Sequence, residues 1–148
     1  MPAECYVCGV NAQSDPPIRE AIVDGPRWRV AHAFGTSVPG WLVVVPRRHI
    51  VALSELTAEE AVELGPLLVR LTSALREVLG CEKTYVALFA EAEGFAHAHF
   101  HVVPRMADLD PSFRGPGVFQ LLGVPEEATP DHASLDALCD RLAAAART

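Results

Sequence analysis

Three histidines occur at every second position in the segment "HAHFHVV", residues 97–103. In a β-strand, successive side chains alternate between the two faces. A strand here would place His97, His99 and His101 on one face and leave the apolar residues between them for the other. Such a row of imidazoles could bind a metal ion. Alternatively, one neutral imidazole could attack phosphorus while its neighbour donates to a phosphate oxygen. The remaining alternative is a polar strand face without a chemical role.

A Cys-x-x-Cys pair, Cys5 and Cys8 in "CYVC", lies near the N-terminus. This spacing is common as half of a zinc site, but it is also compatible with a redox pair or with two ordinary thiols. Cys81 and Cys139 have no such neighbours in the sequence. They are expected to be buried as small apolar side chains.

Periodicity and turn signals predict the elements that must position these residues. Thr57 and Glu60 form a capping-box pattern, and apolar residues then recur every three or four positions as far as Gly80. This pattern predicts a long helix with one apolar face. Pro66 lies inside the helix and is expected to kink it or to split off its first turns.

The other predicted elements are mostly strands, which together with the long helix indicate the α+β class. Two strands flank the turn at 24–26, and an apolar run at 41–45 is bounded by turn formers. Further strands are predicted at 84–90 and at 97–104, where Pro104 should end the ladder. An irregular stretch at 106–130 precedes a terminal helix, with Thr129 as cap and Pro130 at its first position.

The composition fits one globular domain, with 148 residues of which 50% are hydrophobic and 21% charged. The net charge of −7 argues against a nucleic-acid partner, because no excess of basic side chains can neutralise phosphates. A local basic site could still form from Arg47, Arg48, Arg105 or Arg114. We find no signal-peptide pattern and no apolar run of about 20 residues, so we expect a cytoplasmic protein without a membrane partner. In that compartment, cysteines are expected to be thiols or metal ligands.

The segment "HAHFHVV" resembles the signature of the histidine-triad (HIT) superfamily, His-φ-His-φ-His-φ-φ, where φ is apolar. The upstream "PGWLVVVPRRH", the long helix and the "CYVC" pair are also similar to elements of this family. The resemblance implies a HIT-like α+β fold, an antiparallel sheet with one long helix and a C-terminal helix. Residues 1–105 would form the HIT domain with its N-terminal Cys-x-x-Cys segment, and residues 106–148 would complete the same domain. The resemblance also implies a homodimer.

The resemblance further implies a role for each histidine. His99 would be the nucleophile that attacks the α-phosphorus of a nucleotide and forms a covalent nucleotidyl-histidine, which water then hydrolyses. His101 would contact the phosphate and assist proton transfer to the leaving group, and the chemistry itself needs no metal. Zinc-containing relatives imply a separate structural zinc site, whose ligands here would be Cys5, Cys8, His49 and His97. The implied substrate is a dinucleoside polyphosphate or, as the alternative, a nucleoside phosphoramidate.

The sequence departs from the family pattern where substrate contacts are expected. Many members carry Gly-Gln-Ser before the triad, and the matching positions here are Ala92, Glu93 and Gly94, in a shortened loop "AEAEG". The acidic residue that grips ribose in many members is replaced by Ala33, beside His32.

Other residues are expected to make the substrate contacts. Arg105 could contact the phosphate, whereas Arg114 is expected to be a solvated surface residue. Phe34 is the preferred candidate for the base pocket among the aromatics that could form it, which also include Trp28, Trp41 and Phe95.

Two other functions remain open at this point. The triad itself could hold a catalytic metal, which would make the protein a metallohydrolase. The chain could also be a nucleotide-binding module that has lost efficient catalysis, an interpretation that Glu93 and Ala33 favour.

Overall fold

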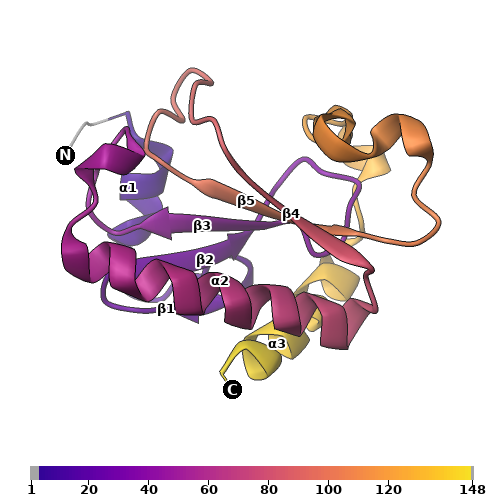
Figure 1. Cartoon of the computed structure of the whole chain (residues 1–148), viewed down its shortest axis with the longest axis horizontal. Coiled ribbons are helices and arrows are strands. Elements are labelled where there is room, and N and C mark those ends of the chain that lie inside the picture. Colours follow the sequence, from indigo (N-terminus) through magenta and orange to yellow (C-terminus); the bar gives the residue numbers. More distant parts are fainter. Residues whose placement is uncertain (1–3, 148) are drawn as a thin grey trace.

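A five-stranded antiparallel sheet forms the centre of the computed structural model, which describes residues 4–147 (Figure 1). The spatial order is β1-β2-β3-β5-β4, and every neighbouring pair is antiparallel. The structure therefore confirms the α+β class. The strands are β1 (Val23–Asp24), β2 (Trp28–His32), β3 (Leu42–Pro46), β4 (Lys83–Leu88) and β5 (Phe100–Arg105).

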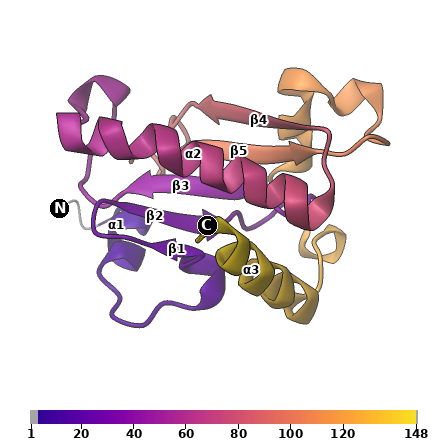
Figure 2. The same cartoon turned by 60° about the horizontal axis from the view of Figure 1, so that its bottom comes forward.

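Two helices cover one face of the sheet, α2 (Ala58–Leu79) and α3 (His132–Ala146), as Figure 2 shows. Their apolar residues form one core with the sheet residues that face them, including Val30, Val44 and Val102. Alternation along each strand leaves the intervening side chains for the opposite face. That opposite face carries the candidate site.

The predicted ends of α2 are confirmed. The Thr57 hydroxyl accepts from the Glu60 N–H at 3.1 Å, and the Glu60 carboxylate accepts from the Thr57 N–H at 2.8 Å. Gly80 ends the helix with a left-handed φ of 71°. The expected split at Pro66 is wrong, because α2 runs through it without interruption. Pro66 has no N–H to donate to the carbonyl of Val62, four residues earlier in the helix. Val62 is 73% exposed, so water can donate to that carbonyl instead.

Four predicted boundaries are corrected. The N-cap of α3 is Asp131, whose carboxylate accepts from the Ser134 N–H at 2.9 Å, so Thr129 lies outside the helix. Strand β5 begins at Phe100, and strand β4 ends at Leu88. Pro104 does not end β5, since it pairs with Thr84 of β4. Pro104 lies beyond the last β3 partner of this strand, Val102, so its missing N–H breaks no bond to β3.

The other face of the sheet is covered by short, mostly irregular segments. The helix α1 (Tyr6–Asn11) lies over one end, and the β4–β5 loop rises beside it (Figure 1). As predicted, residues 106–130 are irregular, with 3₁₀ turns at Pro111–Phe113, Gly115–Leu121 and Glu126–Ala128. Val118 and Phe119 of this segment pack on Trp41 in a second small core. Within residues 4–147, no helix has the length and apolar character needed to cross a membrane.

Candidate functional site

A pocket of about 540 Å³ opens on the face of the sheet opposite α2. Its floor consists of small side chains from β2 and β3, Ala31, Val43 and Val45. His99 and His101 line it together, so the structure brings the two residues predicted for catalysis into one cavity. Their rings lie edge to face with centroids 5.0 Å apart.

A main-chain carbonyl defines the tautomer of His99. The Nδ1 atom lies 2.9 Å from the His97 carbonyl oxygen. Because that oxygen can only accept, Nδ1 must carry the proton and donate. The lone pair of neutral His99 is then on Nε2, the atom required for attack on an electrophile.

The opposite tautomer holds for His101. The indole Nε1–H of Trp41 donates to Nδ1 of His101 at 3.0 Å, and an indole can only donate. The proton of neutral His101 therefore sits on Nε2. Burial lowers the pKa of His101 to about 4, and the neighbouring His99 adds to this effect, so His101 is neutral at physiological pH.

A second cluster lies where β3 ends and β5 begins, beside α1. It consists of Cys5, Cys8, His49 and His97, whose ligand atoms all lie within 4.8 Å of one another. The Sγ atom of Cys8 lies 3.3 Å from Nδ1 of His49 and 3.6 Å from Nδ1 of His97. The Sγ atom of Cys5 lies 3.5 Å from Nδ1 of His97, and the two Nδ1 atoms are 3.2 Å apart. Ligand atoms around a tetrahedral zinc ion are separated by about 3.3–3.8 Å, so the four residues fit such an ion.

A second feature supports this fit. Nε2 of His97 donates to the Pro46 carbonyl at 2.8 Å, which directs the unprotonated Nδ1 towards the cysteines. Metal-bound histidines are commonly oriented by such an outer hydrogen bond. Burial also lowers the pKa of His97, which favours the neutral imidazole that a metal needs. The first histidine of the triad thus belongs to this cluster, and the other two belong to the pocket.

Aromatic side chains form the walls of the pocket. Phe34, 60% exposed, contacts Tyr6 and Phe95 with ring centroids 5.4 and 6.0 Å apart, and Tyr6 and Phe95 are 5.7 Å apart. We call Tyr6, Phe34 and Phe95 the aromatic trio. Phe89 and Phe119 form the opposite wall, with centroids 5.2 Å apart. The predicted base-pocket residue Phe34 therefore lines the pocket, whereas Trp28 and Trp41 are buried.

Arg105 does not lie among the residues that line the pocket. Its guanidinium pairs with Glu82 at 3.3 Å. Arg114 donates to the carbonyls of Ala107 and Leu109, within its own segment. The structure thus brings neither arginine to the two pocket histidines.

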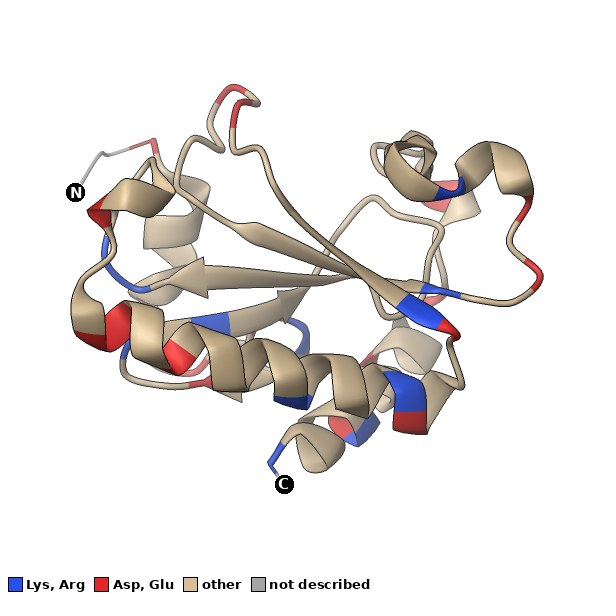
Figure 3. Cartoon of the chain, viewed as in Figure 1, with Lys and Arg blue, Asp and Glu red and all other residues tan. Residues whose placement is uncertain are grey.

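The departures from the family pattern have a structural explanation. Glu93 is exposed and does not line the pocket, and Figure 3 shows acidic residues at the tip of the β4–β5 loop. His32 uses both ring nitrogens inside the protein: Nδ1 donates to the Ala33 carbonyl, and Nε2 accepts from the Gly40 N–H. Burial lowers its pKa, so His32 is a neutral structural residue. Neither Ala33 nor His32 supplies a polar group to a ligand.

The sequence did not predict three residues at this site. Trp41 orients His101, although its position in an apolar run suggested only a core or base-pocket role. Arg29 and Glu20 line the pocket as an ion pair at 2.8 Å. The one signal in the sequence was an arginine inside the apolar strand "WRVAH", since a buried arginine needs a partner.

The antiparallel sheet, the helices on one of its faces and the two triad imidazoles in a pocket on the other define a histidine-triad class of protein. The chain belongs to the HIT-domain family, whose model matches residues 19–108. Proteins of this family are typically nucleotide hydrolases or transferases. No curated protein matches the chain with significance.

Solved structures share the fold. A Zn-bound histidine triad family protein from Mycobacterium smegmatis is 23% identical, with a TM-score of 0.70 over 97% of this chain and 93% of that one. A histidine triad protein from Bradyrhizobium japonicum is 24% identical, with a TM-score of 0.68 over 82% and 86%. A hypothetical histidine triad nucleotide-binding protein from Sulfolobus tokodaii is 12% identical, with a TM-score of 0.67 over 97% and 92%.

Proposed function

We propose that the protein is a nucleotide phosphohydrolase or nucleotidyl transferase that acts at the α-phosphate through a covalent intermediate on His99. Its substrate would be a dinucleoside polyphosphate. The observation that carries this proposal is the bond from His99 Nδ1–H to the His97 carbonyl at 2.9 Å. This bond holds the imidazole in the tautomer whose Nε2 lone pair is free, in a pocket large enough for a nucleoside.

In the first step, Nε2 of His99 forms a bond to the α-phosphorus, and the bond from phosphorus to the bridging oxygen breaks. The electron pair leaves with that oxygen. In the second step, a water oxygen attacks phosphorus and releases a proton to solvent, the N–P bond breaks, the nucleoside monophosphate departs and His99 recovers its lone pair. Throughout both steps, Nε2–H of His101 donates a hydrogen bond to a phosphate oxygen and stabilises the charge that develops there.

The state of His101 favours an anhydride over a phosphoramidate as substrate. A nucleotide departs as a stable phosphate anion, whereas an amine must be protonated as it departs. A neutral imidazole with a pKa of about 4 is a hydrogen-bond donor but a poor source of protons. A phosphoramidate hydrolase is the second candidate, because the pocket would accept its nucleotide half equally well.

The test is turnover of a panel of dinucleoside polyphosphates and adenylated amines by the wild type, His99→Ala and His99→Asn. We expect turnover of at least one dinucleoside polyphosphate, and a loss of about 1,000-fold or more in both variants. Acid quench of the wild type should trap a nucleotidyl-protein that both variants lack. His132→Ala, at an exposed residue of α3, is the control and should keep full activity. Full activity in His99→Ala would exclude this mechanism.

We also propose that Cys5, Cys8, His49 and His97 bind one zinc ion with a structural role. The ion would connect α1 to the segments that follow β3 and precede β5, and no reaction step would pass through it. Elemental analysis should give one zinc per chain in the wild type and none in Cys5→Ser/Cys8→Ser. If the variant keeps its metal and EDTA abolishes its activity, the metallohydrolase alternative is correct instead.

One remaining alternative has a direct test. A nucleotide-binding module without catalysis is excluded by turnover of any member of the panel.

A homodimer is part of the proposal, because β4 is an edge strand whose Val86 is 46% exposed. Light scattering should give twice the 15.9 kDa of the chain.

A further inference from the structure

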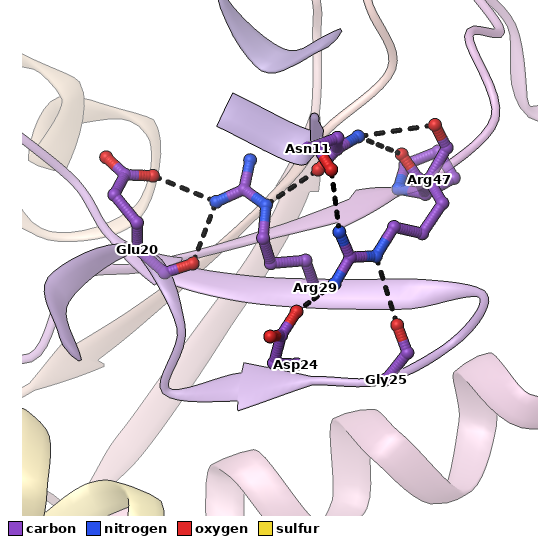
Figure 4. A network of polar contacts seen from close by, with 7 residues as sticks. Asn11, Glu20, Asp24, Gly25, Arg29 and Arg47 are labelled. Carbon is purple, nitrogen blue, oxygen red and sulfur yellow. Dashed lines mark hydrogen bonds and ion pairs between the residues drawn. The ribbon is translucent and has the colours of Figure 1, made fainter. Parts of the chain in front are cut away.

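Glu20 and Arg29, which both line the pocket, form an ion pair in which the Arg29 side chain is buried and the Glu20 side chain is half-buried (Figure 4). Arg29 is only 2% exposed, although it lies in β2 between apolar neighbours. Its Nη1 donates to the Glu20 carboxylate at 2.8 Å and to the Glu20 carbonyl at 2.9 Å. Its Nε donates to Oδ1 of Asn11 at 2.7 Å. This network fixes both side chains.

The Glu20 carboxylate is held from a second side by the aromatic trio. The Tyr6 hydroxyl donates to its other oxygen at 3.0 Å. Burial and the nearby carboxylate raise the pKa of Tyr6 to about 12, so the hydroxyl keeps its proton. A carboxylate offers about four acceptor positions, and these contacts occupy one on each oxygen. Glu20 therefore presents a fixed, unfilled acceptor to the pocket.

Other polar side chains that line the pocket are already committed or are exposed. His99 and His101 serve the phosphate in the proposed reaction, and both nitrogens of His32 are bonded within the protein. Glu91 lies on the exposed β4–β5 loop. The remaining lining is mostly aliphatic and aromatic. Among the described residues, the Glu20–Arg29 pair is thus the built polar group available to the nucleoside part of a ligand.

The distance of the Glu20–Arg29 pair from His99 suits a contact with the base of a bound nucleotide rather than with its ribose. Arg29 of β2 pairs with Val45 of β3, whereas His101 of β5 pairs with Val43 on the other side of β3. Two strand spacings, about 10 Å, thus separate the pair from the catalytic strand. A nucleotide with its phosphate at His99 spans this distance when its base extends towards Glu20. A base lying against the aromatic trio would direct the groups in its plane at the carboxylate that Tyr6 holds.

We propose that Glu20, positioned by Arg29 and Tyr6, selects nucleotides whose base carries an exocyclic amino group. This inference rests on the proposed function, because it takes the phosphate position from His99. An amino group donates to the carboxylate, whereas an oxo group would place its lone pairs against those of Glu20.

The test compares nucleotides that carry this amino group with partners that carry an oxo group in its place. Equilibrium binding to the wild type is measured for adenosine and inosine 5′-monophosphates, and for cytidine and uridine 5′-monophosphates. A hydrogen bond to a charged group predicts that the amino member of each pair binds roughly 10- to 100-fold more tightly. 2′-Deoxyadenosine 5′-monophosphate should bind within about 3-fold of the ribonucleotide, whereas a larger loss would show that Glu20 reads the sugar instead and would overturn the proposal.

The Glu20→Gln variant tests whether Glu20 causes the preference for bases with an amino group. Its amide oxygen and the residue-20 carbonyl remain as acceptors for Arg29, and Asn11 still binds Nε, so the fold should be retained, as circular dichroism can check. The amide N–H₂ now faces the ligand, so the preference for the amino base should fall below about 3-fold or reverse. Glu63→Gln, which removes a carboxylate from a surface pair with Arg27, should leave the preference unchanged.

The outcomes separate the two proposals. Equal binding of both members of each pair by the wild type, or an unchanged preference in Glu20→Gln, overturns the role of Glu20 and leaves the His99 mechanism standing. Absence of binding by every nucleotide overturns both proposals.

Discussion

Trp41 donates its indole N–H to Nδ1 of His101 at 3.0 Å, and the two rings meet edge to face with centroids 5.7 Å apart. Trp41 is fully buried and also packs against Phe119, so it cannot turn away. The proton of His101 is thereby kept on the nitrogen that faces away from Trp41. His99 has the complementary arrangement, with its proton bonded to the His97 carbonyl. Neutral His99 therefore has its lone pair on Nε2, whereas neutral His101 has its proton there, because the carbonyl can only accept and the indole can only donate.

Trp41→Phe keeps an aromatic ring and removes the donor. Because the bond stabilises neutral His101, its loss should raise the pKa of His101 and move the acidic limb of the kcat/KM profile to higher pH. The unpaired buried nitrogen should cost about 1–3 kcal/mol of the unfolding free energy. Nitrogen NMR of the imidazole reports the tautomer directly.

Trp28→Phe is the matched control for this prediction. It removes a buried indole bond of equal length, to the Glu60 carbonyl at 3.0 Å, without touching His101. It should lower stability and leave the pH profile in place. An unchanged His101 signal in Trp41→Phe would show that the indole does not set its tautomer.

The metal cluster predicts a coupling between zinc and stability. Cys5 and Cys8 begin α1, while His49 and His97 lie at distant positions in the chain, so their common ion would cross-link separate segments. Chelation or Cys5→Ser/Cys8→Ser should therefore lower the melting temperature by about 5 °C or more, as calorimetry can measure. Cys81→Ala/Cys139→Ala removes two core thiols and should leave the zinc content unchanged. Equal melting temperatures with and without the metal would argue against the structural role.

Acidification should destabilise the protein through its buried histidines. The pKa of His101 is lowered from 6.5 to about 4, and burial lowers the pKa of His32 and His97 in the same direction. Between the unfolded value and the folded value, the unfolded chain binds more protons. The unfolding free energy should therefore be fully present above about pH 6.5 and fall as the pH drops towards about 4.

Urea denaturation at neutral pH and at about pH 5 measures this fall. His101→Gln, compared at equal zinc content, should show a shallower fall than the wild type. The same slope in both proteins would exclude His101 as a contributor.

The capping box of α2 predicts a local stability effect. Thr57→Ala removes the acceptor for the Glu60 N–H and should cost about 1 kcal/mol, or roughly 2–4 °C in melting temperature. The control is Thr72→Ala, because the Thr72 hydroxyl bonds only to carbonyls of its own helix, those of Leu68 and Val69. That change should remain within about 0.5 kcal/mol.

Short-range patterns were sufficient for several features. The caps and the apolar spacing of α2 act within a few residues, so Thr57 and Gly80 were predicted correctly. The expected separation of the triad also appears, with Phe100 and Val102 in the core beneath α2 and His99 and His101 in the pocket. The boundaries were less certain, because Thr129 and Asp131 are equally suitable cap residues and only the fold decides between them.

The sequence by itself determined the long helix, the spacing of the histidines and, through its resemblance to a family, the ligand set of the proposed zinc site. Only the tertiary structure decided that Arg105 turns to Glu82, that Glu93 lies outside the pocket, and that Trp41 and the Glu20–Arg29 pair reach the site. The physical reason is the long sequence separation between the residues that meet at these sites. Trp41 and His101 are 60 residues apart in sequence, and Cys5 and His97 are 92 apart. Such contacts arise from the packing of the whole sheet, and no local pattern encodes which nitrogen of a histidine will meet a partner across it.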